Sequence, residues 1–191
     1  MLGSAQTGTG KTAAFGLPVL HHIDTSSDDI QALILSPTRE LVQQIKKQLF
    51  KFTKFNEQKV FVEAVFGGEK IDRQMNNLKR TTHIVVATPG RLIDLIERGS
   101  VDISHVKTVI LDEADEMLSM GFKQDLNRIL NFTTKTDRKT WLFSATMPEE
   151  IKRIVKTYMD SNAPRVEINS NSLVNANIRH HFVKTTIKEK F

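Results

Sequence analysis

Five short apolar runs rich in β-branched residues recur along the sequence, with helix-like patterns between them. The runs are 32–36, 60–65, 83–87, 106–112 and 140–145. Most are continuously apolar rather than alternating, which is typical of strands buried on both faces of a sheet. Strands that alternate with helices predict a mostly parallel α/β sheet with helices on both faces. In such sheets, ligands bind in the loops at the carboxyl ends of the strands.

Two segments have the apolar spacing of amphipathic helices. One is 38–54, and the other follows Pro148, which suits the first turn of a helix. Glu149 and Glu150 would complement the dipole of that second helix. The helix that follows the opening loop contains Pro18, so we expect a kink or an early stop there.

Composition excludes some chemistry and favours one class of partner. The 191 residues carry a net charge of +5 and contain no cysteine, so disulfides, thiolate metal sites and a cysteine nucleophile are excluded. A basic surplus suits a polyanion such as nucleic acid, although ordinary surfaces can also be basic. No apolar run approaches the ~20 residues of a membrane span. We therefore expect a cytoplasmic monomer with no membrane contact.

The segment AQTGTGKT (5–12) has the pattern of a phosphate-binding loop. The general pattern is glycine, four residues, then Gly-Lys-Ser/Thr, and here Ala5 takes the place of the first glycine. Gly8 and Gly10 allow the backbone to curl so that its N–H groups face phosphate oxygens. Lys11 would contact the β- and γ-phosphates, and Thr12 would offer a hydroxyl to Mg²⁺. The alternative is a glycine-rich turn before a helix.

The segment VILDEAD (109–115) supplies the acidic partner that a nucleotide hydrolase needs. Asp112, at the end of a buried strand, would hold Mg²⁺ beside Thr12, and Glu113 would polarise the attacking water as general base. An acidic helix start in solvent is the alternative. Ser144 and Thr146 follow another strand, and their hydroxyls could hydrogen-bond the acidic loop. On local evidence alone, a simple turn of small residues is the better explanation.

Taken together, these segments closely resemble the first domain of the DEAD-box family of ATP-dependent RNA helicases. Residues 112–115 spell the family name, and 5–12 match its phosphate loop, Ala5 included. PTREL (37–41), GG (67–68), TPGR (88–91) and SAT (144–146) match its other motifs in order. The resemblance covers essentially the whole chain, and the stretches DEADEMLSMGF and LFSATMPEEI are most similar to bacterial members of the cold-shock or ribosome-assembly type.

The resemblance implies a RecA-like fold, ATP and Mg²⁺ as cofactors, and a role for each matched residue. Asp115 would pair with Ser144 and Thr146 and couple the ATP site to RNA binding and domain closure. Lys11, Asp112 and Glu113 would be catalytic, with Thr12 and Asp112 at the metal. The residues expected around the phosphates are Ala5, Gln6, Thr7, Gly8, Thr9, Gly10, Lys11 and Thr12. The residues expected to contact RNA are Pro37, Thr38, Arg39, Gly67, Gly68, Thr88, Pro89, Gly90 and Arg91. Backbone N–H groups and arginines bind RNA phosphates, so binding should be largely independent of base sequence.

The resemblance also divides the chain. Residues 1–168 would form the first RecA-like domain, 169–177 a linker, and 178–191 the opening strand of a second RecA-like domain whose remainder is missing. In the family a buried strand precedes the phosphate loop, and we expect only Met1 and Leu2 of it here, without the adenine-recognition segment. Loss of that central strand would expose sheet edges. Because the rest of the second domain is missing, the isolated chain should bind nucleotide weakly and show negligible RNA-stimulated hydrolysis.

Two other functions remain open from the sequence. One is a different phosphate-loop helicase or translocase that acts on DNA, against which PTREL and TPGR argue. The other is a domain that docks RNA or a protein without turnover.

Overall fold

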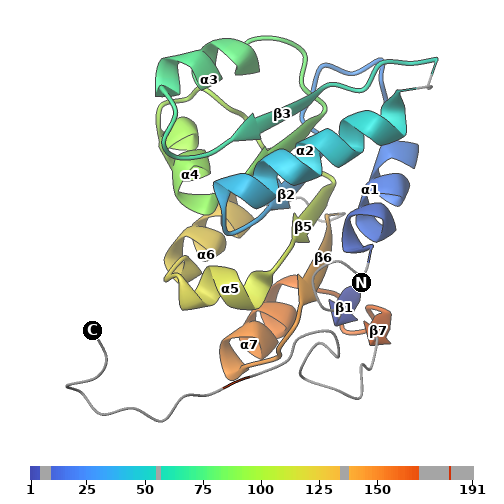
Figure 1. Ribbon diagram of the computed structural model, residues 1–191, viewed down its shortest axis with the longest axis vertical. Helices are drawn as coiled ribbons and strands as arrows, with labels where there is room; N and C mark the ends of the chain where they lie inside the picture. The colour runs from blue at the N-terminus through green and yellow to red at the C-terminus, as the bar shows by residue number, and fades with distance from the viewer. Residues whose placement is uncertain (5–9, 55–56, 134–137, 168–180, 182–191) are drawn as a thin grey trace.

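The computed structural model describes residues 1–4, 10–54, 57–133, 138–167 and 181, and the following statements concern these residues. They contain a seven-stranded sheet with the order β3-β4-β2-β5-β6-β1-β7, in which all neighbours are parallel (Figure 1). The strands are β1 (Leu2–Ser4), β2 (Ala32–Leu35), β3 (Val62–Val65), β4 (Ile84–Ala87), β5 (Thr108–Leu111), β6 (Lys139–Ser144) and β7 (Arg165–Glu167). The predicted parallel α/β sheet is confirmed.

Helices cover both faces of the sheet, as the alternation of elements predicts. They are α1 (Lys11–His21), α2 (Arg39–Thr53), α3 (Ile71–Leu78), α4 (Pro89–Glu97), α5 (Ala114–Ser119), α6 (Lys123–Phe132) and α7 (Glu149–Tyr158). Helices α1 and α2 lie side by side on one face, and the others pack on the opposite face (Figure 1). None of the helices in the described ranges is long and apolar enough to cross a membrane.

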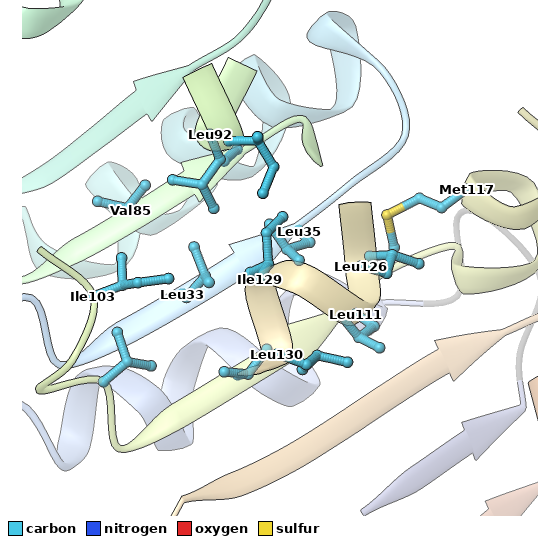
Figure 2. Packing of buried hydrophobic residues seen from close by; sticks show 14 of the residues in the cluster. Leu33, Leu35, Val85, Leu92, Ile103, Leu111, Met117, Leu126, Ile129 and Leu130 are labelled. Carbon is cyan, nitrogen blue, oxygen red and sulfur yellow. The ribbon is translucent and has the colours of Figure 1, made fainter. Parts of the chain in front are cut away.

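Each central strand contributes to two separate cores. In β2, Leu33 and Leu35 pack under α4, α5 and α6, while Ala32 and Ile34 pack under α1 and α2. Figure 2 shows the first of these cores, where leucines of β2 meet Leu92 of α4 and the apolar face of α6. Alternating residues of one strand point to opposite faces, so a strand covered on both faces is apolar at every position. This explains the continuous apolar runs in the sequence.

The strand register collects the motifs at one edge of the sheet. Leu35 of β2 pairs with Ala87 of β4 and with Leu111 of β5, so these strands end at the same level. The hydrogen-bonded ladder then continues by one residue. The backbone N–H groups of Ser36, Thr88 and Asp112 donate to the carbonyls of Ala87, Val65 and Leu35 at 3.0, 3.0 and 2.9 Å. The segments after β2, β3, β4 and β5 therefore leave the sheet side by side.

The first strand differs from the sequence-based expectation. Residues Leu2–Ser4 form β1, which pairs in parallel with β6 on one side and β7 on the other. The expectation that only Met1 and Leu2 remain of this strand, leaving sheet edges open, is therefore wrong. Three residues are enough to pair with both neighbours, but they are too few to show a strand pattern. Helix α1 also continues through Pro18 to His21, so it ends within a turn of the proline.

We expect Gly3→Ala to destabilise the fold. A Cβ atom at Gly3 would lie 2.7 Å from Cδ1 of Phe143. That ring is buried and packs against Phe15 with 5.4 Å between centroids, so it has little room to move. Overpacking of this kind should lower the free energy of unfolding by about 1–2 kcal/mol, measured by urea denaturation. Gly67→Ala is the control, because nothing lies within 4 Å of its Cβ position. Equal stability of the two variants would contradict the prediction.

Buried His83 should make the fold sensitive to mild acid. Its side chain is fully buried and accepts a hydrogen bond from the Phe61 N–H at 3.1 Å. Burial lowers the pKa of His83, and the nearby Asp28 and Asp24 offset only part of that effect. The unfolded chain therefore binds a proton below about pH 6.5 that the folded chain does not, and stability falls as the pH drops through this range.

The measurement is the free energy of unfolding of wild type and His83→Gln at pH 7.5 and 5.5. Between these two pH values, one proton can lower the free energy of unfolding of the wild type by at most about 1.4 kcal/mol more than that of the variant. The comparison with the variant is needed because Asp112, whose pKa is raised, works in the opposite direction. Identical pH dependence in the two proteins would contradict the prediction.

Candidate functional site

The predicted phosphate-binding segment leads into α1. Gly10 precedes the helix with φ 89°, a left-handed conformation that favours glycine, and Lys11 and Thr12 form the first turn. The helix start therefore presents its backbone N–H groups and positive end near Lys11, as an anion site requires. The other predicted phosphate-contacting residues, Ala5, Gln6, Thr7, Gly8 and Thr9, lie outside the described residues.

Lys11 reaches the acidic residues that follow β5. Its Nζ lies 3.8 Å from Oδ1 of Asp112 and 3.9 Å from Oε1 of Glu113, and all three side chains are largely buried. These residues, with Gly10 and Thr12, line a hollow of about 420 Å³ that is closed on its other side by α2. The structure thus brings together the predicted catalytic residues of two segments that lie a hundred residues apart.

Burial shifts the titration of Asp112 to higher pH. Removal from water raises its pKa to about 6, the charge of Glu113 acts in the same direction, and Lys11 opposes both. Its Oδ1 atom is buried and accepts no hydrogen bond from the described residues. A nearby cation stabilises the ionised form of such a buried carboxylate. Together with the Thr12 hydroxyl it fits Mg²⁺, which typically takes one or two protein oxygens and completes its shell with substrate phosphates and water.

Glu113 has an unusual backbone conformation. With φ 54° and ψ 51° it is the one non-glycine residue with positive φ within the described ranges. This conformation costs of the order of 1–3 kcal/mol for a side chain of this kind and is often found at functional sites. The sharp bend lets α5 start at Ala114 while the Glu113 carboxylate stays beside Lys11. The sequence gives no direct signal of the bend.

Asp115 connects the acidic loop with the segment after β6. Its Oδ2 accepts hydrogen bonds from the backbone N–H and the hydroxyl of Thr146, at 2.9 and 2.8 Å. Partial burial acts to raise the pKa of Asp115, but the Thr146 and Ser144 donors outweigh it, so the pKa lies below its usual range. The Ser144 hydroxyl itself donates to the Thr146 carbonyl at 2.7 Å. Both hydroxyls therefore act on Asp115, and Ser144 also fixes the turn that carries Thr146.

The residues predicted to contact RNA gather at the ends of β2, β3 and β4. Thr38 caps α2 by accepting a hydrogen bond from the Leu41 N–H at 3.3 Å. The next residue, Arg39, places its guanidinium 5.0 Å from the centre of the Phe66 ring. A Cβ atom at Gly68, whose φ is 82°, would lie 3.5 Å from the same guanidinium. Pro37 and Gly67 occupy the same two turns, so these segments form one surface.

The third segment joins this surface through Arg91. Thr88 precedes α4 and Pro89 occupies its first turn, with Gly90 next. The Arg91 Nη1 atom donates to the Glu69 carbonyl at 3.0 Å, which ties α4 to the loop after β3. Sequence reasoning missed Phe66 and Glu69, although both lie within two residues of the glycine pair at 67–68.

Comparison with known proteins identifies the family. The family model described as "DEAD/DEAH box helicase" matches residues 1–154. The chain belongs to the DEAD/DEAH box helicase family. It is similar to "ATP-dependent RNA helicase CshA" of Listeria monocytogenes, with 48% identity over the whole chain and 36% of that protein. It is 44% identical to "DEAD-box ATP-dependent RNA helicase CshA" of Geobacillus kaustophilus, of which it covers 40%. The chain thus spans well under half the length of these relatives, and both are bacterial, as the sequence indicated.

Solved structures of DEAD-box proteins share the fold. The crystal structure of a DEAD box protein from Methanococcus jannaschii matches with a TM-score of 0.82 and 39% identity, over 89% of this chain and 45% of that one. The yeast DEAD-box splicing factor Prp28 matches with a TM-score of 0.79 and 37% identity, over 87% of this chain and 40% of that one. The predicted RecA-like fold is confirmed, and this chain aligns with less than half of each of these DEAD-box chains.

Proposed function

We propose that this chain is the ATP-binding first domain of an ATP-dependent RNA helicase. The observation that carries the proposal is the meeting of Lys11 with Asp112 and Glu113 at 3.8 and 3.9 Å. A cation, a metal-binding carboxylate and a second carboxylate at the end of a parallel sheet suit nucleotide hydrolysis. The names of the curated relatives, which are ATP-dependent RNA helicases, support the same function.

In this proposal each group of the hollow has one task. Residues 5–12 would surround the phosphates, and Lys11 would contact the β- and γ-phosphates. The Thr12 hydroxyl and the Asp112 carboxylate would hold Mg²⁺, which would neutralise charge on the phosphates. Glu113 accepts the proton of the attacking water as general base. The buried position of Asp112 and Lys11 excludes bulk water and strengthens these interactions.

The surface formed by Arg39, Gly68, Arg91 and their neighbours binds RNA in this proposal. Its hydrogen-bond donors are guanidinium groups and the backbone N–H groups at the starts of α2 and α4. Donors of both kinds commonly bind phosphate oxygens. None of them forms a pocket for a base edge, so binding should be independent of sequence. Asp115 and Thr146 link this function to the nucleotide site.

Unwinding requires a partner domain in this proposal. Residues 169–177 would link the domain to a second RecA-like domain that starts at 178–191, and these segments lie outside the described residues except for His181. ATP and RNA together would close the two domains, and the closed state would separate strands. The parent protein would act as a cytoplasmic monomer, and this chain alone would show negligible RNA-stimulated hydrolysis.

Two measurements test the proposal. Calorimetric titration of the chain with Mg-ADP should give saturable binding. A chimaera in which residues 1–191 replace the matched segment of the Listeria helicase should hydrolyse ATP faster when single-stranded RNA is added. A folded chimaera with no RNA-stimulated turnover would overturn the proposal. Stronger stimulation by single-stranded DNA than by RNA would instead favour a DNA translocase. RNA binding without any nucleotide binding would favour a docking domain.

A further inference from the structure

The hollow beside Lys11 has a wall to which the proposed chemistry assigns no task. This wall is one face of α2, where polar and cationic side chains recur at i, i+3, i+4 and i+7. They are Gln44, Lys47, Gln48 and Lys51. The spacing places all four on one side of the helix, whereas the buried residues Val42, Ile45 and Leu49 fix the helix to the sheet. The wall is therefore held in place by the core beneath it.

The two lysines of this wall have no acidic partner among the described residues. Lys46, their neighbour on α2, is neutralised by Glu63, with 2.9 Å between Nζ and Oε2. Lys47 and Lys51 are exposed, and neither forms an ion pair with any acidic side chain of the described residues. The opposite wall holds two carboxylates, Asp112 and Glu113, and Lys11 lies within 4 Å of both. The two lysines of α2 would therefore add positive charge for an anion that enters the hollow between these walls.

The geometry points to a nucleotide rather than to RNA as the partner of these lysines. Lys47 and Lys51 line the same hollow as Lys11 and Thr12. The surface proposed for RNA lies instead at the first turn of α2 and at the ends of β3 and β4. A volume of about 420 Å³ is also within the usual range of small-molecule sites.

We propose that Lys47 and Lys51, with Gln44 and Gln48 as hydrogen-bond donors, contact the terminal phosphate of the bound nucleotide. They are specificity-determining residues that raise the affinity for the triphosphate relative to the diphosphate. The extra phosphate brings additional negative charge close to Asp112 and Glu113, and the two lysines offset that repulsion. This inference rests on the proposed nucleotide site.

The test is a calorimetric comparison of two double variants with wild type. K47Q/K51Q removes the two cations of the wall, and K152Q/K156Q removes the same net charge from α7 on the other face. Each protein is titrated with Mg-ADP and with the Mg complex of adenylyl imidodiphosphate, a slowly hydrolysed triphosphate. K47Q/K51Q should bind the triphosphate about three- to tenfold more weakly, with Mg-ADP affinity changed less than about twofold. The difference should shrink at 0.5 M salt, which screens exposed charges. K152Q/K156Q should behave as wild type.

The other possible results of these titrations each point to a different conclusion. Equal loss for both nucleotides, or no loss for either, would overturn the assignment of Lys47 and Lys51 to the terminal phosphate. Weaker RNA binding with unchanged nucleotide affinities would overturn it too, and would extend the RNA surface along α2. Failure of the wild type to bind any nucleotide would overturn the proposed function itself, before the variants are compared.

Discussion

Glu113→Gln in the chimaera with the Listeria helicase should lower RNA-stimulated ATP turnover by about 10²–10⁴-fold. The amide has nearly the shape of the carboxylate but cannot accept a proton from water. Lys11, 3.9 Å from the Glu113 carboxylate, keeps its contact with Asp112, so the phosphate side of the site should remain formed. Steady-state phosphate release, with and without saturating single-stranded RNA, measures the effect.

Two controls separate chemistry from folding in this experiment. Mg-ADP affinity of Glu113→Gln should stay within about threefold of wild type, since the general base makes no bond to the diphosphate. Glu116→Gln is a matched control, because it changes the same side-chain type on the first turn of α5. If Glu113→Gln retained more than a tenth of the turnover, another group would have to be the base.

Lys11→Ala should weaken Mg-ADP binding to the chain about 10- to 100-fold. A charge-assisted bond to a phosphate contributes about 1.5–3 kcal/mol, and each 1.4 kcal/mol corresponds to a factor of ten. The substitution also leaves Asp112 and Glu113 without the cation that lies within 4 Å of both. These two carboxylates would then repel the phosphates directly.

Calorimetry of wild type, Lys11→Ala and Lys152→Ala tests this prediction. Lys152 is an exposed lysine paired with Glu149 on α7, so its removal should leave nucleotide affinity unchanged. Unaltered Mg-ADP affinity in Lys11→Ala would show that the hollow beside α1 is not where the phosphates bind.

The strands and the order of motifs could be predicted from the sequence because their signals are local. Apolar runs buried on both faces are continuous, and the predicted runs 32–36, 83–87 and 106–112 contain β2, β4 and β5. The helix predicted over 38–54 corresponds to α2, whose cap is Thr38. Parallel pairing then requires that the segments after these strands meet at one edge, and this is why the sequence alone could place Asp112 near the phosphate loop.

The features that the sequence did not reveal depend on contacts between distant residues. Strand β1 is defined by its two neighbours rather than by any pattern within three residues. Arg39 stacks on Phe66, and Arg91 donates to the Glu69 carbonyl. Both contacts join segments that are distant in the sequence, so residue propensities within one segment cannot reveal them. The positive φ of Glu113 occurs at the bend where α5 starts, and glutamate carries no preference for it.

The hydrogen bonds that extend the ladder past β5, β2 and β4 have a mechanical consequence. They make the sheet stiff between Asp112, which belongs to the proposed nucleotide site, and the end of β3, which belongs to the proposed RNA surface. Three strand spacings of about 4.8 Å separate the ends of β5 and β3 by roughly 14 Å. That separation is fixed by the bonds of Asp112, Ser36 and Thr88 to their neighbouring strands. A ligand at one of these sites cannot change the distance between them. It can affect the other site only by rotating the whole domain relative to a second body that contacts both sites.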